Sequence, residues 1–271
     1  MKNLNIIYLQ IAGLNIKIYF TPPRKKTDDY FSYNKLRSTI IQYFGGFVLT
    51  KKPSTINYYI ELAKRNLVVS RQIRENKISY SLDFYVEEPN KIVSYQYISL
   101  SQLLLLLKQV VNKFTVSYSL FLLHASASGY KGSSLIFTGK PNAGKSTMMS
   151  LIKDKYHPLA DDSVIIKKNS NSYFMYQTPF IEKNDWVKKT SKVFRIYKIF
   201  FLRKSTRYKS TKIIDKSLIL RMLMPQLIVT RNNYKISIRR LTEFVRNFDD
   251  FYYLYFAKDK NKTIELLDSS V

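Results

Sequence analysis

The sequence predicts an α/β fold in which a nucleotide-binding domain follows a smaller, β-rich N-terminal domain. Short runs rich in Tyr, Ile, Val and Phe, broken by turns, dominate the first hundred residues. Further along the chain, strand-like and helix-like segments alternate, as in α/β domains. A glycine-containing loop there lies between an apolar run and a helical stretch. The predicted domains are residues 1–119 and residues 120–271.

The N-terminal domain is expected to be an antiparallel sheet followed by a helix. Turns at 12–14, 75–76 and 89–90 separate the runs of β-branched and aromatic residues. Ser99 or Ser101 is placed to cap a helix that ends near Phe114. The predicted strands are 6–11, 15–20, 58–62, 67–72, 78–87 and 92–98.

The C-terminal domain is expected to mix strands with helices. A polar turn at 169–172 joins two of its strands. The predicted strands are 134–138, 164–167, 173–176, 197–202 and 252–256, and the predicted helices are 146–152, 213–224 and 238–248.

Composition limits the classes of protein that fit. With 271 residues and 45% hydrophobic content, the chain can bury one large or two modest cores. The most apolar stretch, 103–107, is followed at once by Lys108, so it predicts a buried helix and no membrane span. The N-terminus lacks the apolar region of a signal peptide, and the absence of cysteine excludes disulfides and thiolate metal sites. We therefore expect a cytoplasmic protein.

The net charge of +26 would attract polyanions such as nucleotides, nucleic acid or an acidic protein. The basic residues are scattered, and Lys, Asn, Ile and Tyr are all plentiful, as in AT-rich genomes. Composition bias is therefore favoured over a dedicated nucleic-acid surface. A nucleic-acid-stimulated ATPase is kept as an alternative, although no helicase-type motif is evident.

One motif carries specific chemistry, because it matches the phosphate-binding pattern G-x-x-x-x-G-K-[ST] at every fixed position. The glycines let the backbone curve around phosphate oxygens, and the following helix directs its positive N-terminus at the same anion. We expect Lys145 to reach the β- and γ-phosphates, Ser146 to ligate Mg²⁺, and Thr147 to contact the α-phosphate. The alternatives are a glycine turn before a helix, or a loop that binds nucleotide without chemistry. The motif consists of Gly139, Lys140, Pro141, Asn142, Ala143, Gly144, Lys145, Ser146 and Thr147.

Paired aspartates follow the loop, and a histidine precedes it. Asp161 and Asp162 can hold Mg²⁺ or accept a proton from an attacking hydroxyl, and in an extended backbone they point apart. Solvated carboxylates in a turn are the alternative. His124 lies in an apolar run, which on its own favours a hydrogen-bonded core residue, whereas His157 is expected to be exposed. Two histidines are too few for a multi-histidine metal site.

Together, His124-Ala125-Ser126, the loop and Leu159-Ala160-Asp161-Asp162 resemble the HPr kinase/phosphorylase family. That group of bacterial and archaeal kinases is distantly similar to phosphoenolpyruvate carboxykinase. The resemblance covers about residues 120–185 well, and it implies a P-loop domain of the HPr kinase/phosphoenolpyruvate carboxykinase type.

The resemblance also implies roles for single residues. Asp162 would accept the proton of a serine or similar hydroxyl, and His124 would orient that aspartate. Lys145 would stabilise the transferred phosphoryl group. Metal contacts would come from Ser146, from Asp161 directly or through water, and from Glu182 at the position of a family Mg²⁺ ligand.

Two departures weigh against HPr itself as the substrate. Ser146-Thr147 stands where true HPr kinases have Ser-Glu, and no glycine-rich signature follows the aspartates. The expected function is that of a kinase using ATP and Mg²⁺ on a hydroxyl of a peptide, protein or small molecule. The wider group includes kinases of precursor peptides. A homo-oligomer is expected by the same resemblance, and a nucleotide-binding protein without catalysis is the remaining alternative.

Overall fold

The structure is a computed structural model that describes residues 5–21, 30–63, 68–74, 77–95, 97–182 and 184–271. The chain divides into two compact units, Met1–Val110 and Val111–Val271. Helix α2 (Leu100–Ser117) spans this division, and the expected boundary after residue 119 falls just beyond the helix. Among the described residues, no helix is long and apolar enough to cross a bilayer.

The first unit contains a mixed five-stranded sheet, so the expectation of an antiparallel sheet was wrong. Strands β1–β2 and β6–β7 pair antiparallel, but β2–β3 and β3–β7 pair parallel. Helix α1 (Tyr30–Phe44), which the sequence reading missed, lies between β2 and β3 and lets the chain return for parallel pairing. The sheet order is β1 (Ile6–Ile11), β2 (Leu14–Phe20), β3 (Tyr58–Ala63), β7 (Lys91–Tyr95) and β6 (Tyr85–Glu88).

Several N-terminal expectations differ in extent. The predicted strand 78–87 is divided between β5 (Lys77–Asp83) and β6, and β5 pairs with β4 (Val68–Arg74) in a separate hairpin. Residue 67 of the predicted strand 67–72, the predicted turn 75–76, and residue 96 of the predicted strand 92–98 lie outside the described residues.

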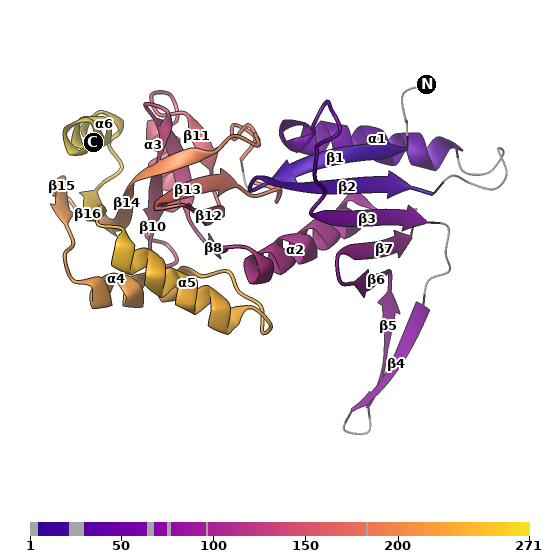
Figure 1. Ribbon diagram of the computed structural model, residues 1–271. Helices are drawn as coiled ribbons and strands as arrows, with labels where there is room; N and C mark the ends of the chain where they lie inside the picture. The colour runs from indigo at the N-terminus through magenta and orange to yellow at the C-terminus, as the bar shows by residue number, and fades with distance from the viewer. Residues whose placement is uncertain (1–4, 22–29, 64–67, 75–76, 96, 183) are drawn as a thin grey trace. The chain divides into compact units, whose positions relative to one another are not determined.

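The second unit is built on a nine-stranded sheet with helices on its two faces (Figure 1). The pairing order is β11-β9-β10-β14-β13-β12-β8, with β16 beside β14 and β15 beside β16. The strands are β8 (Leu120–Leu123), β9 (Ser126–Tyr130), β10 (Ser133–Thr138), β11 (Pro158–Ala160), β12 (Val164–Asn169), β13 (Ser172–Gln177), β14 (Phe194–Lys204), β15 (Lys209–Lys212) and β16 (Phe251–Phe256).

This sheet curls until its two ends meet. Strands β8 and β9 are five steps apart in the pairing order, which is about 24 Å in a flat sheet. Only His124 and Ala125 separate them in sequence, a link that spans at most about 11 Å. The chain also runs from β11 at one end to β12 at the other through 161–163. We call the place where the two ends of the sheet meet the seam. His124 therefore lies on one of the two links across the seam, and Asp161 and Asp162 lie on the other.

Residues alternate between two apolar layers along the central strands. Ile136, Ile199 and Phe201 face one layer, which contains α4 (Lys216–Leu223) and α5 (Tyr234–Asn247). The residues between them on β10 and β14 face the other layer, which contains α3 (Lys145–Ile152) and α6 (Lys260–Ser270). This two-sided burial explains the continuous apolar runs of β10 and β14.

The sequence reading missed β8, β9, β11, β15 and α6. These strands are short, and β15 (Lys209–Lys212) is polar, so neither length nor pattern marks them. The predicted helices 213–224 and 238–248 are shifted, because Asp215 caps α4 and Asn233 precedes α5.

Substitution of Phe244 tests how much the apolar layer that contains α5 contributes to stability. The Phe244 ring lies 5.6 Å from Phe121, 4.7 Å from Tyr173 and 5.8 Å from Phe251, measured between centroids. We expect Phe244→Ala to lower the free energy of unfolding by roughly 3–5 kcal/mol, measured by urea denaturation. Tyr234→Ala on the same helix, at a 49% exposed position, is the control and should cost far less. Equal losses would contradict the assignment of Phe244 to the core.

Candidate functional site

The loop from Gly139 to Gly144 connects β10 to the first residue of α3. Gly139 has φ 151° and Gly144 has φ 102°, which are conformations that favour glycine. A Cβ on Gly144 would lie 2.9 Å from the Phe256 ring, and one on Gly139 would lie 2.9 Å from the Ala143 Cβ. Conformation and packing therefore both require the two glycines of the motif.

Three parallel strands end around this loop. β10 pairs parallel with β14, and β14 pairs parallel with β16, so their carboxyl ends share one edge of the sheet. Ligands of open α/β sheets bind at such edges. The end of β14 brings Lys204 to the loop, and the end of β16 brings Phe256.

A cavity of about 420 Å³ lies over the N-terminus of α3. Lys145 is buried beside it, and its Nζ donates to the Gly139 carbonyl at 3.2 Å. The Ser146 side chain is exposed, and the lining is mostly polar or cationic, which suits an anion at a helix N-terminus. The lining residues are His124, Pro141, Asn142, Gly144, Lys145, Ser146, Thr147 and Lys204.

The seam of the sheet brings His124 to Asp162. Strand register pairs Leu123 with Val164, so the link that follows Leu123 lies beside the link that precedes Val164. His124 Nδ1 lies 2.8 Å from the Asp162 carbonyl oxygen and 3.6 Å from Asp162 Oδ1. Since a carbonyl can only accept, Nδ1 is the protonated nitrogen in this contact. Both side chains are about one-third exposed, at 35% and 37%.

Other groups hold the backbone of the histidine. The His124 N–H donates to the Gln226 carbonyl at 2.7 Å, and the Thr138 hydroxyl donates to the His124 carbonyl at 3.4 Å. Thr138 is the last residue of β10, directly before the phosphate loop. His157, by contrast, is exposed and does not line the cavity.

Asp161 points away from solvent and is 1% exposed. The Asn184 amide donates to its Oδ2, and its backbone carbonyl accepts from the Ser126 hydroxyl at 3.0 Å. Within the described part of the chain, Asp161 Oδ1 has no hydrogen-bond partner. A buried carboxylate oxygen of this kind fits a bound water or cation.

Glu182 clamps the turn that carries the two aspartates. Its Oε2 accepts from the backbone N–H groups of Asp161 at 2.8 Å and Asp162 at 3.2 Å. Its Oε1 pairs with Lys189, whose Nζ also donates to the Thr178 carbonyl at 2.9 Å. Burial lowers the pKa of Lys189, while the Glu182 carboxylate opposes that shift. Glu182 thus sets the position of Asp162 within the site.

The metal ligands expected from the sequence differ in how well they fit Mg²⁺, which prefers oxygen ligands together with substrate phosphates. The Ser146 hydroxyl fits, because it lies in the cavity at the start of α3. Asp161 fits through Oδ1. Glu182 fits least, because both of its oxygens already have partners. Among the described residues, no group of three His, Asp or Glu side chains is arranged to hold a metal.

Sequence reading did not find Asn184, Lys189 or Lys204. Asn184 and Lys189 act through contacts with Asp161 and Glu182 that depend on how the loop folds, for which no local pattern exists. The sequence did contain one indication of Lys204, because this residue lies just after the apolar run 197–202, which was predicted to be a buried strand.

The comparisons with known proteins include a distant structural likeness. No family model matches the chain, and no curated protein matches it. The chain is similar to a solved structure of the Hpr(Ser) kinase/phosphatase from Coxiella burnetii, with 13% identity and a TM-score of 0.29. The match covers 55% of this chain and 87% of that chain. At these values the likeness does not establish a family.

The buried pair Lys189–Glu182 provides a stability test. Its side chains are 14% and 5% exposed. Lys189→Met would leave the Glu182 charge buried with its cation removed, which we expect to cost roughly 3–5 kcal/mol in the free energy of unfolding. Lys188→Met removes the same charge at an exposed position and serves as the control in urea denaturation. Equal stability of the two variants would contradict the clamp.

Proposed function

We propose that this protein is an ATP- and Mg²⁺-dependent kinase that transfers the γ-phosphoryl group to a hydroxyl of a peptide, protein or small-molecule acceptor. The observation that carries the proposal is the contact of His124 with Asp162 beside the phosphate-loop cavity. A phosphate loop alone would fit many nucleotide-binding proteins. The Asp162 carboxylate, about one-third exposed and beside the His124 that lines this cavity, is the proposed acceptor of the proton in transfer to a hydroxyl.

The loop would bind the triphosphate in a single orientation. Thr147 would contact the α-phosphate, and Lys145 would reach the β- and γ-phosphates after leaving the Gly139 carbonyl. Another cavity, of about 380 Å³, includes Thr147 together with Phe256 and offers an aromatic wall for the nucleoside. The γ-phosphate would then lie toward His124.

In the transfer step, the acceptor oxygen forms a bond to the γ-phosphorus while the bond from that phosphorus to the bridging oxygen of ADP breaks. The acceptor proton passes to the Asp162 carboxylate. His124 keeps this carboxylate in place, because its Nδ1–H is bound to the Asp162 backbone carbonyl. Lys145 stabilises charge on the transferred group.

Mg²⁺, when bound with ATP, would neutralise charge on the β- and γ-phosphates. Ser146 is the residue proposed to hold it, with Asp161 Oδ1 available directly or through water. Glu182 is proposed to act as the clamp of the aspartate turn rather than as a metal ligand.

Asp162→Asn tests the proton acceptor. The amide keeps the size of the side chain and leaves the backbone contact with His124 intact. We expect transfer of label from γ-labelled ATP to fall roughly 10²- to 10⁴-fold, with unchanged affinity for nucleotide. Asp185→Asn, at an exposed position, is the control and should leave transfer intact. Unchanged transfer in the Asp162 variant would overturn the role.

Lys145→Met tests the phosphate loop. Loss of the ammonium group removes contacts to two phosphates, so we expect weaker ATP binding in calorimetry and slower transfer. Lys153→Met removes the same charge from an exposed position at the end of the same helix and should change neither. ATP hydrolysis that requires added DNA or RNA, without any labelled hydroxyl product, would instead favour the nucleic-acid-stimulated ATPase.

A further inference from the structure

A second cavity adjoins the phosphate loop on the side of helix α4. Its volume of about 540 Å³ lies within the range of binding sites for small ligands and side chains. It shares Pro141, Asn142 and Lys204 with the phosphate cavity, so the two are adjacent. Its walls come from the start of the loop, the end of β14, and α4 with the turn that follows it.

The lining combines an apolar surface with cations. Phe201, Leu218 and Met222 are among its apolar residues, whereas the described residues that line it include four cations and no carboxylate. The cations are Lys140, Arg203, Lys204 and Arg221. Such a lining is complementary to a ligand that carries a carboxylate next to an apolar group, because the arginine fork matches a carboxylate.

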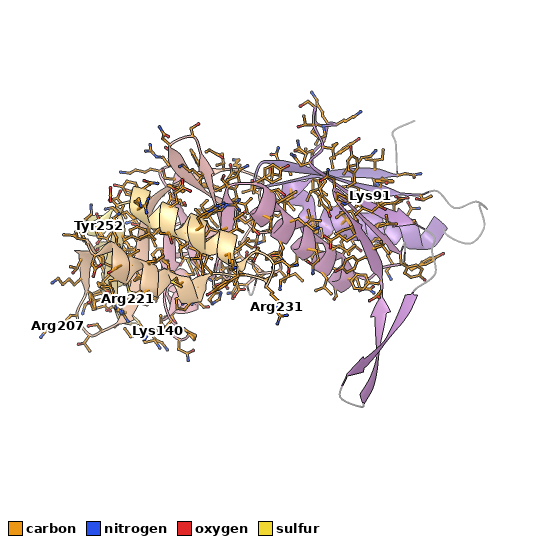
Figure 2. All side chains as sticks on the ribbon, turned by 60° about the horizontal axis from the view of Figure 1, so that its bottom comes forward. Lys91, Lys140, Arg207, Arg221, Arg231 and Tyr252 are labelled. Atoms are coloured by element: carbon orange, nitrogen blue, oxygen red, sulfur yellow. The ribbon has the colours of Figure 1, made fainter. Side chains whose placement is uncertain are left out.

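The two arginines differ in how firmly they are held. The Arg203 guanidinium lies 5.2 Å from the Tyr253 ring centroid and contacts Met222 Sδ at 3.8 Å. Arg221 is exposed on α4, and Figure 2 shows it in the same region of the surface as Lys140. A ligand carboxylate can therefore meet one preorganised cation and one adaptable cation.

The direction of the nucleotide places this cavity on the acceptor side. Thr147 borders the cavity with the aromatic wall, at the proposed nucleoside end. Gln226 lines the second cavity, and its carbonyl accepts from the His124 backbone N–H at 2.7 Å. The second cavity therefore opens beside His124, where the γ-phosphate would meet the acceptor hydroxyl.

We propose that this second cavity binds an acidic peptide segment whose carboxylate contacts Arg221 and Arg203 and whose apolar side chain packs on Leu218 and Met222. The proposal rests on the kinase function above and names its acceptor as a peptide with acidic and apolar residues close to the phosphorylated hydroxyl. Charge complementarity selects this occupant, since every charged group in the lining is a cation.

Two fluorescent peptides provide the test. Each has one serine flanked by leucine, with glutamates in one peptide and lysines in the other. Binding is measured by polarisation in the presence of Mg²⁺ and a non-hydrolysable ATP analogue, at about 0.15 M salt. We expect the glutamate peptide to bind more tightly, and Arg221→Glu to weaken it about tenfold, as loss of a charged hydrogen bond implies. Label from γ-labelled ATP should follow the same order.

Arg231→Glu is the matched control, because it makes the same charge change at an exposed position outside the cavity lining (Figure 2). It should weaken peptide binding by less than about twofold, because salt screens distant surface charges. Equal weakening by both variants would mean that the +26 field attracts the peptide without a site, and would overturn the proposal. So would a loss of ATP-analogue affinity in Arg221→Glu that matches the loss for peptide.

Failure of the kinase function has a different signature. If the glutamate peptide binds with the expected dependence on Arg221 and none of it is labelled, the result supports the peptide-binding site and contradicts the kinase function. If wild type and Arg221→Glu both label the glutamate peptide at the same rate as the lysine peptide, the result supports the kinase function and contradicts the acidic-peptide site.

Discussion

The curl of the nine-stranded sheet is the constraint on which the site depends. Two short links close its seam, one carrying His124 and the other carrying Asp161 and Asp162. Antiparallel register fixes the first link, because Leu123 pairs with Val164. The second link is fixed on its other side by the pairing of Ala160 with Ala127. Backbone hydrogen bonds of the sheet therefore bring the histidine and the aspartate close together, and the Glu182 side chain holds the turn that carries the aspartate.

The conformation of the loop from Gly139 to Gly144 could be predicted from the sequence because its requirements are local. Glycine conformation, a helix N-terminus and a buried strand all fall within one short stretch, and the structure has each of them there. The pairing of the aspartates with the loop followed from a resemblance. Their geometry required the register of four strands, two of which are too short to be recognised as strands from sequence alone.

The errors have equally specific causes. Helix α1 was missed although Leu36, Ile40 and Phe44 are buried with helical spacing, because the exposed Ile41 and Tyr43 obscure that pattern. Its omission made the first sheet look antiparallel. Glu182 as a metal ligand stays a prediction from the resemblance; its oxygens accept two backbone N–H groups and pair with Lys189. No spacing rule reveals a partner that a tertiary fold supplies.

Lys204 lines all three cavities around the loop. One flexible ammonium group can face only one anion at a time, so occupation of any of these cavities changes the electrostatic environment of the others. By linkage, an occupant that engages Lys204 lowers the affinity for a second anion, and the second lowers the affinity for the first by the same factor. Such antagonism would favour the departure of one anionic product once the other competes for the same lysine, so this single residue could set the order of release.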